Sequence, residues 1–162
     1  MRLIVATTKS WGIGREGDLP FHLSGDLKHF RALTTGGTVI MGRKTLDSLP
    51  GGRALPGRRN IVITRDRNFS RENVEAVHSL EEAAELVEGL DPDRVWVCGG
   101  GEIYRAMLPL CDRATVTRVE ADPACDTFFP NLEGDPAWER AGAQDPVHEG
   151  DHTYTFVEYR RK

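Results

Sequence analysis

Short apolar runs alternate with helical segments through the first two thirds of the chain, and this order limits the possible folds. Run 3–8 is almost continuously apolar, which is typical of a strand buried on both faces. The expected strands are 3–8, 38–41, 60–64, 74–77, 94–98, 114–120, 137–142 and 153–160, and the expected helices are 24–33, 43–49, 80–88 and 102–108. The order predicts a three-layer α/β fold. Its central, mostly parallel eight-stranded sheet ends in a C-terminal antiparallel hairpin and carries helices on both faces.

Local signals mark several of these helix ends. Ser24 is a candidate N-cap for helix 24–33, and Ser79-Leu-Glu-Glu82 forms a capping box before helix 80–88. Pro50-Gly-Gly52 ends helix 43–49.

Length and composition indicate one domain with a small-molecule partner. The chain has 162 residues without linker or repeat, so we expect a single domain over 1–162. A net charge of −4 argues against a nucleic-acid partner, and no apolar run approaches the ~18 residues that span a membrane. The N-terminus turns polar too soon for a signal peptide. Three widely spaced cysteines, Cys98, Cys111 and Cys125, suit free thiols in a reducing cytoplasm.

Positive charge is concentrated in one segment of this acidic chain. Residues 43–71 carry eight basic side chains against two acidic ones, whereas residues 72–162 carry eight basic against 20 acidic. A locally cationic segment suits a small polyanionic ligand, although an Arg-rich solvated surface would have the same composition.

Three known sequence motifs match or nearly match this chain, but the local structure predicted around each one does not suit the usual function of the motif. Gly12–Gly17 spells the dinucleotide fingerprint, but Pro20 follows where that motif needs a helix. Residues 37–45 nearly spell a phosphate-binding P-loop, but Arg43 breaks the register. His148-Glu-Gly-Asp-His152 spells a zinc-peptidase helix, yet Gly150-Asp151 and the strand that follows predict a hairpin loop with two exposed histidines and no metal.

Two anion-binding patterns survive this test. Val95-Trp-Val-Cys-Gly-Gly-Gly-Glu-Ile-Tyr104 places three glycines between a strand and a helix, where backbone N–H groups can approach a phosphate. Met41-Gly-Arg-Lys-Thr45 and Thr64-Arg65 place cations and hydroxyls at the carboxyl ends of two strands, where ligands of open α/β sheets bind. Together they indicate one extended ligand with separated phosphates.

A candidate carboxylate and a guanidinium-bearing turn complete the pattern. Asp26 falls in the first turn of helix 24–33, where helix capping alone would explain it. Its neighbours one turn away, Leu23 and Phe30, are apolar, which also allows a carboxylate facing an apolar cleft. The turn 55–59 ends in Arg58-Arg59, which suits a carboxylate or a phosphate.

Taken in order, these stretches resemble the dihydrofolate reductase family over essentially the whole chain. The matching stretches are Ile4–Ala6, Trp11–Gly14 with Gly17–Pro20, Asp26–Phe30, Val39–Thr45, Leu55–Arg58, Gly99–Gly101 with Tyr104, Val116–Thr117 and Asp126–Pro130. The resemblance implies an enzyme of one-carbon metabolism and a target of antifolates, which reduces 7,8-dihydrofolate with NADPH. Hydride would go to C6 and a proton to N5. Residues 12–19 would then form the mobile active-site loop of the family.

The resemblance also implies the residues of the substrate site. Asp26 would pair with the edge of the pterin ring. Thr117 would hydrogen-bond both Asp26 and the pterin amino group. A water admitted near Leu19 and Phe21 would supply the proton. Arg58 would bind the glutamate carboxylate. The expected catalytic residues are Asp26, Leu19, Phe21 and Thr117, and the expected substrate-binding residues are Ile4, Val5, Ala6, Leu27, Phe30, Leu49, Arg58 and Thr117.

For the cofactor NADPH, the resemblance assigns the 2′-phosphate to Arg43, Thr64 and Arg65. It assigns the pyrophosphate to Gly100 and Gly101 and implies a cis peptide between Gly99 and Gly100. Backbone groups of Ala6 and Ile13 would hold the carboxamide. The expected set is Ala6, Ile13, Gly14, Gly42, Arg43, Lys44, Thr45, Thr64, Arg65, Cys98, Gly99, Gly100, Gly101, Glu102, Ile103 and Tyr104.

The chain departs from the family pattern at a few positions. Phe21 stands where most members have Trp and removes an indole N–H that would hold an ordered water. Ser24 replaces a common Pro, and Glu102 puts a negative charge beside the expected pyrophosphate. Asp126-Thr127 match the segment that braces the mobile loop, so we expect that contact here.

We expect the chain to be a monomer that binds dihydrofolate, and three other functions remain open at this point. One is a related reductase of riboflavin biosynthesis, against which the carboxylate at Asp26 argues. The second is a nucleotide-binding module without catalysis. The third is the zinc peptidase suggested by residues 148–152.

Overall fold

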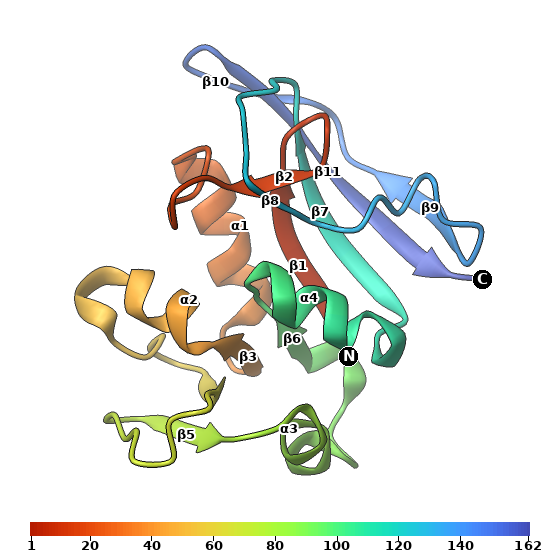
Figure 1. The fold of residues 1–162 in the computed structure, drawn as a ribbon. Helices are drawn as coiled ribbons and strands as arrows, with labels where there is room; N and C mark the ends of the chain where they lie inside the picture. The colour runs from red at the N-terminus through yellow and green to blue at the C-terminus, as the bar shows by residue number, and fades with distance from the viewer.

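A central sheet dominates the computed structural model, which describes every residue, Met1–Lys162. Its strands are β1 (Arg2–Thr7), β3 (Thr38–Gly42), β4 (Arg59–Ile63), β5 (Val74–Val77), β6 (Val95–Val97), β7 (Arg113–Val119), β9 (Trp138–Ala143), β10 (Val147–Glu149) and β11 (His152–Arg161). Eight of them lie in the order β10-β11-β7-β1-β6-β3-β4-β5, and β9 pairs with β11 as a ninth (Figure 1). The five pairings among β1, β3, β4, β5, β6 and β7 are parallel, and those of β11 are antiparallel. The predicted mixed sheet is confirmed.

Helices cover both faces of this sheet, as predicted. They are α1 (Ser24–Thr34), α2 (Arg43–Ser48), α3 (Leu80–Val87) and α4 (Gly101–Met107), with 3₁₀ turns at Pro50–Gly52, Pro92–Arg94 and Leu108–Leu110. Side chains alternate between two apolar clusters because successive strand residues point to opposite faces. Ile40 joins the cluster that contains residues of α3 and α4. Val39 and Met41 join the cluster that contains Leu46 of α2 and contacts Phe30 of α1.

Short strands in irregular segments were missed by the sequence prediction. The expected loop after the first strand contains β2 (Gly12–Gly14), which pairs with β8 (Thr127–Phe128) in a separate two-stranded sheet. β10 was also missed. Strands of two or three residues carry no alternating pattern, and their pairing depends on distant partners. The other element boundaries agree with the prediction to within one or two residues.

The predicted N-cap of α1 is wrong. The cap position is Leu23, which has no side-chain hydrogen bond, and Ser24 is already helical. The N–H groups of Ser24 and Gly25 instead donate to the carboxylate of Glu149, which comes from β10. By contrast, Ser79 caps α3 as predicted, since its hydroxyl accepts the N–H of Glu82 at 3.1 Å.

The segment that spells a zinc motif is a hairpin, as predicted. β10 and β11 pair with Glu149 opposite His152 and a turn at Gly150-Asp151. His148 is exposed as expected, but His152 is half-buried, because its ring packs edge-on against Phe21 at 5.1 Å between centroids. All three cysteines are free thiols. No helix has both the length and the apolar character that crossing a membrane requires.

Candidate active site

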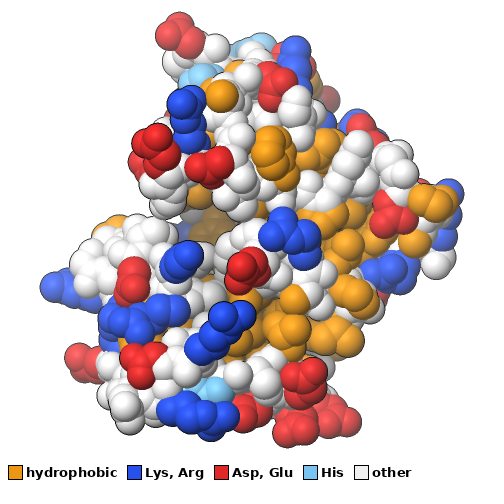
Figure 2. Space-filling view, viewed as in Figure 1, with side chains coloured by type: hydrophobic (Ala, Val, Ile, Leu, Met, Phe, Trp, Pro, Cys, Tyr) orange, Lys and Arg blue, Asp and Glu red, His pale blue; other side chains and the backbone are white.

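The sheet opens between β1 and β6 at its carboxyl edge. β6 pairs with β1 only at Arg2 and Leu3, whereas β1 continues beside β7 as far as Thr7. The edge of β1 beyond Leu3 therefore faces the glycine turn that follows β6 instead of a strand. Such an opening at a change in strand order is where open α/β sheets bind ligands. Figure 2 shows a hollow on this side of the molecule, with apolar side chains at its floor and basic side chains at its rim.

Three consecutive glycines form the turn after β6. The peptide between Gly99 and Gly100 is cis, as predicted, and Gly99 has a φ of 110°. A Cβ at Gly99 would lie 3.0 Å from the ring of Tyr104. The Tyr104 hydroxyl donates to the carbonyl of Ile4 at 2.7 Å, and Gly42 N–H donates to the Gly99 carbonyl at 2.8 Å. These contacts join the turn to both β1 and β3, so glycine is required here.

The start of α4 offers hydrogen-bond donors to an anion. Its first internal hydrogen bond runs from Tyr104 N–H to the Gly100 carbonyl, and no side chain caps it. The N–H groups of Gly101, Glu102 and Ile103 have no acceptor within the helix, as at any helix N-terminus. The residues present therefore fit a phosphate group. Glu102, which could repel an anion, is exposed and forms no ion pair.

The predicted cationic residues meet at the neighbouring strand ends. Arg43 directly follows β3, and Thr64-Arg65 directly follow β4, with Gly42 opposite Ile63 in the parallel register. The Arg43 guanidinium lies 4.1 Å from the centroid of Phe69. It is also 3.3 Å from Asp47 and 3.6 Å from Asp66, a pairing that the sequence prediction did not include. Lys44 and Arg65 are exposed and unpaired, so a cationic patch remains available.

Asp26 lies in the first turn of α1 and faces β7. Its Oδ1 accepts a hydrogen bond from the Thr117 hydroxyl at 2.5 Å, which confirms the predicted pair. The alternative capping role for Asp26 is wrong, because Glu149 caps this helix. Burial raises the pKa of Asp26, and the negative charge of Glu149 raises it further. The hydrogen bond from Thr117 and the nearby ring of His29 oppose this rise only in part.

We expect the Asp26→Asn variant to be more stable to heat than the parent at pH 7. A carboxyl whose folded pKa is raised above its unfolded pKa stabilises the native state at low pH, and that stability is lost as the pH rises through the folded pKa. Asparagine removes this penalty and keeps an oxygen for Thr117. Calorimetric Tm values from pH 3 to pH 8 test this. A Tm difference that does not grow as the pH rises would contradict it.

Apolar and basic side chains flank Asp26. Leu19 and Leu27 are each 57% exposed, so their apolar side chains are accessible to a ligand. Phe30, Leu49 and Val5 are half-buried, and Ile4 is buried. The Arg58 guanidinium lies 5.8 Å from the centroid of Phe30 and donates to the Thr34 hydroxyl at 3.1 Å. Arg58 therefore lies beside α1, on which Asp26 and Leu27 also lie.

The loop after β1 is braced as expected. Asp126 N–H donates to the Gly14 carbonyl at 2.9 Å, and the Asp126 carboxylate accepts the N–H of Glu16 at 2.8 Å. These two bonds join the segment before β8 to the loop that contains Leu19. The structure thus brings the loop residues Ile13 and Gly14 to the same edge as the glycine turn, since a Cβ at Gly101 would lie 3.9 Å from Ile13.

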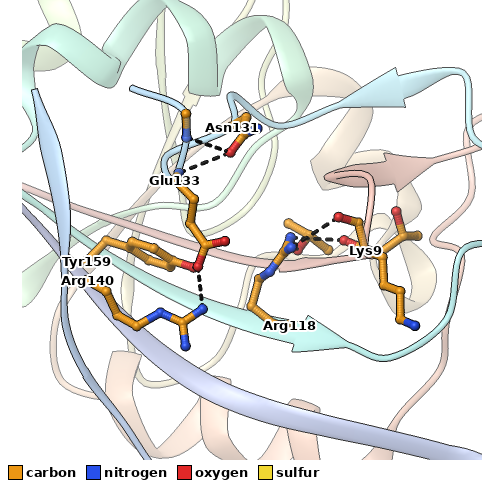
Figure 3. A network of polar contacts seen from close by, with 9 residues as sticks. Lys9, Arg118, Asn131, Glu133, Arg140 and Tyr159 are labelled. Atoms are coloured by element: carbon orange, nitrogen blue, oxygen red, sulfur yellow. Dashed lines mark hydrogen bonds and ion pairs between the residues drawn. The ribbon is translucent and has the colours of Figure 1, made fainter. Parts of the chain in front are cut away.

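Two residues of functional interest, Arg118 and Glu149, were not identified from the sequence. Arg118, next to Thr117, donates to the carbonyls of Thr8 and Lys9, and its guanidinium lies 3.8 Å from the centroid of Trp11. Figure 3 shows Arg118 extending toward Lys9, beside a separate cluster of Tyr159, Glu133 and Arg140. This contact fixes the base of the active-site loop. Glu149 is the second, and no local pattern could have indicated either contact, because the partners are more than 100 residues apart.

A half-buried carboxylate on α1 and a glycine turn with free N–H groups at the same open sheet suit a protein that orients a heterocycle and a phosphorylated cofactor. The fold and the site are thus those expected of an oxidoreductase that depends on a nucleotide cofactor. Comparison with known proteins identifies it further. The dihydrofolate reductase profile matches residues 1–161, and the chain belongs to that family.

Relatives match along their full length. The chain is 47% identical to dihydrofolate reductase of Mycobacterium tuberculosis over 163 residues, with 98% of this chain and 96% of the relative covered. It is 37% identical to the Staphylococcus aureus enzyme over 164 residues, with 100% and 98% covered. The structure of dihydrofolate reductase from Enterococcus faecalis complexed with NADP(H) and RAB-propyl matches with a TM-score of 0.87 and 31% identity, over 99% of this chain and 95% of that one. The protein is an NADPH-dependent oxidoreductase that reduces dihydrofolate to tetrahydrofolate.

Proposed function

We propose that Asp26 and Thr117 hold the pterin ring in the cleft beside α1. The observation that carries this proposal is the half-buried, desolvated Asp26 carboxylate, which is hydrogen-bonded to Thr117 at the open edge of the sheet. An ionised carboxylate can accept two parallel N–H bonds from the amino and ring nitrogens of a pterin, which fixes its orientation. In a cleft of low dielectric constant, the same charge favours protonation of the ring.

Apolar side chains and one guanidinium would hold the rest of the substrate. Leu27, Phe30 and Leu49, with Ile4, Val5 and Ala6 of β1, supply the walls. Arg58 would bind the glutamate carboxylate, which a guanidinium can bind in a bidentate geometry. Its position beside Phe30 supports this role.

The residues at the strand ends would hold NADPH, which supplies the hydride when bound. Arg43, Thr64 and Arg65 would bind the 2′-phosphate, with Lys44 and Thr45 beside them. Gly100, Gly101, Glu102 and Ile103 would take the pyrophosphate on backbone N–H groups, next to Gly42, Cys98, Gly99 and Tyr104 of the same turn. Backbone groups of Ala6, Ile13 and Gly14 would hold the carboxamide, which puts the nicotinamide where β1 and β6 part.

The proton for N5 would come from a water admitted beside Leu19. Asp26 would bind the opposite edge of the pterin, so its carboxyl does not reach N5 directly. Phe21 has no polar atom to hold this water. Its ring instead packs on His152, which supports a role in positioning the loop.

We further propose that residues 1–162 form one domain that acts as a monomer in the cytoplasm. The three free thiols suit a reducing compartment.

A crystal structure of the ternary complex with NADP⁺ and folate tests the site. We expect both carboxylate oxygens of Asp26 within hydrogen-bond distance of the pterin and the nicotinamide ring stacked beside it. In solution, NADPH absorbance should fall only after dihydrofolate is added, and a folate-analogue inhibitor should stop the reaction. A pterin whose amino edge lies away from Asp26 would overturn the assignment, whatever the activity.

A further inference from the structure

Glu149 bridges two distant parts of the molecule at the helix that carries Asp26. It comes from β10, at the hairpin that spells the zinc motif. Its Oε2 accepts the N–H of Ser24 at 2.8 Å, and its Oε1 accepts the N–H of Gly25 at 2.9 Å. Both oxygens are thus bound to the first two residues of α1. An acidic side chain is favourable there, because the free N–H groups and the helix dipole attract it.

The carboxylate is itself held in place from β11. The Tyr154 hydroxyl donates to Oε1 of Glu149 at 3.2 Å, and the Tyr154 side chain is buried. Gly25 leaves the space for this contact, since a Cβ there would lie 2.1 Å from the Tyr154 hydroxyl. Beside it, the ring of His152 packs on Phe21, the last aromatic residue before the helix. Two separate contacts therefore tie the hairpin to the 21–25 segment.

We propose that Glu149 is a positioning residue, which holds the N-terminus of α1 so that the Asp26 carboxylate meets the pterin edge. The inference rests on the proposed role of Asp26 and extends it. Asp26 directly follows Gly25, so a displacement of the helix start moves the carboxylate away from its partner Thr117. Small errors in the position of a substrate-binding group can cost large factors in rate.

The charge of Glu149 also acts on Asp26. The groups that face Asp26 are His29 on α1, Thr117 on β7, Glu149 on β10, Tyr154 on β11 and Tyr104 on α4. Burial lowers the pKa of His29, and the negative charges of Asp26 and Glu158 oppose this shift. Burial also raises the pKa values of both tyrosines, which keeps them neutral. Glu149 is the negatively charged neighbour of Asp26, and its repulsion raises the pKa of Asp26, whereas His29 lowers it.

Three variants separate geometry from charge. Glu149→Gln keeps the shape but places an amide NH₂ against a backbone N–H, so we expect about a tenfold rise in the KM for dihydrofolate. The pKa of Asp26 should also fall in this variant. Glu149→Asp keeps the charge but is one methylene shorter, so KM should rise while the pKa of Asp26 changes less. Gly25→Ala should displace Tyr154 and Glu149 together and should add little to the effect of Glu149→Gln in the double variant.

The measurements are steady-state kinetics, NADPH binding and the pKa of Asp26 from NMR of the ¹³C-labelled carboxyl in the free enzyme. We call the contacts of Glu149 with Ser24, Gly25 and Tyr154 the Glu149 clamp. The Kd of NADPH should stay within about twofold of the parent value, because the clamp contacts none of the residues assigned to the cofactor. Asp151→Asn is the matched control, since the side chain of this exposed neighbour in the same turn forms no hydrogen bond or ion pair. We expect it to behave as the parent.

Asp26→Asn, measured in parallel, distinguishes the two ways of failing. If Asp26→Asn loses activity while folded Glu149→Gln keeps the parent KM and the parent Asp26 pKa, Glu149 does not position Asp26. The proposed function then still stands. If Asp26→Asn is also as active as the parent, the assigned site is wrong. If Glu149→Gln does not fold, Tyr154→Phe replaces it as the test, because it removes only the hydroxyl that donates to Glu149. We expect this variant to raise the KM for dihydrofolate about twofold to threefold. An unchanged KM would overturn the proposed role of Glu149.

Discussion

Replacing Asp26 by asparagine is expected to lower kcat/KM for dihydrofolate about 10²- to 10³-fold at pH 7, the cost typical of removing one preorganised electrostatic contact from an active site. The Asp26 side chain is half-buried and partly desolvated, so its charge acts at a lower effective dielectric constant than it would in water. Asparagine keeps the contact with Thr117 but has no negative charge and offers one acceptor in place of two. Steady-state kinetics with NADPH at saturation measure the loss.

The pH dependence gives this prediction a second test. Because burial raises the pKa of Asp26, the parent enzyme itself carries a neutral carboxyl at low pH. The ratio of parent to variant rates should therefore shrink as the pH falls through that pKa. The Kd of NADPH should be nearly unchanged, because none of the residues assigned to the cofactor lies on α1 with Asp26. Turnover by Asp26→Asn at the parent rate would remove the central residue of the proposed site.

Replacing Arg43 by alanine is expected to reduce the preference for NADPH over NADH about 10- to 100-fold. A hydrogen bond to a charged group is worth about 1.5–3 kcal/mol, and about 1.4 kcal/mol is a factor of ten. The loss should fall on NADPH, because NADH has no 2′-phosphate. The ratio of kcat/KM values for the two cofactors is the measurement.

The environment of Arg43 sets the controls for this experiment. Its guanidinium also pairs with Asp47 and Asp66 and stacks on Phe69, so the variant needs a Tm measurement to confirm that it is folded. Arg53→Ala is a matched control, since Arg53 is exposed in the same basic segment and forms no ion pair. An equal loss with NADH and NADPH would contradict the 2′-phosphate role.

The main sheet could be predicted from the sequence because its central strands are buried on both faces. Residues 3–8 and 60–64 are nearly continuous apolar runs, and in the structure Leu3, Ile61 and Val62 are fully buried. The capping box at Ser79 is a local signal and was found for that reason. β2, β8 and β10 were missed because their pairing is decided by contacts over more than 100 residues or by two- and three-residue segments.

The site was predicted less directly. Residue spacing alone allowed either a helix-capping role or a role in substrate binding for Asp26. The resemblance to the dihydrofolate reductase family favoured substrate binding. The cationic patch followed from strand ends, a general property of parallel sheets. The true cap of α1 could not be predicted, since nothing near Ser24 indicates a carboxylate from β10. The glutamate of the zinc motif thus has a structural partner that its neighbours in sequence do not reveal.

The place of β11 in the sheet has a consequence for how the enzyme is made. β11 lies between β7 and β10, and its Phe156 is the neighbour of Thr117 in the antiparallel register. During translation this strand emerges from the ribosome after every other strand of the sheet. Until it does, β7 is an open edge, and Tyr154 has not yet reached Glu149. A nascent chain can thus form most of the strand pairs of this sheet before it can bind its substrate. Catalytic activity therefore depends on the last strand of the sheet to be synthesised.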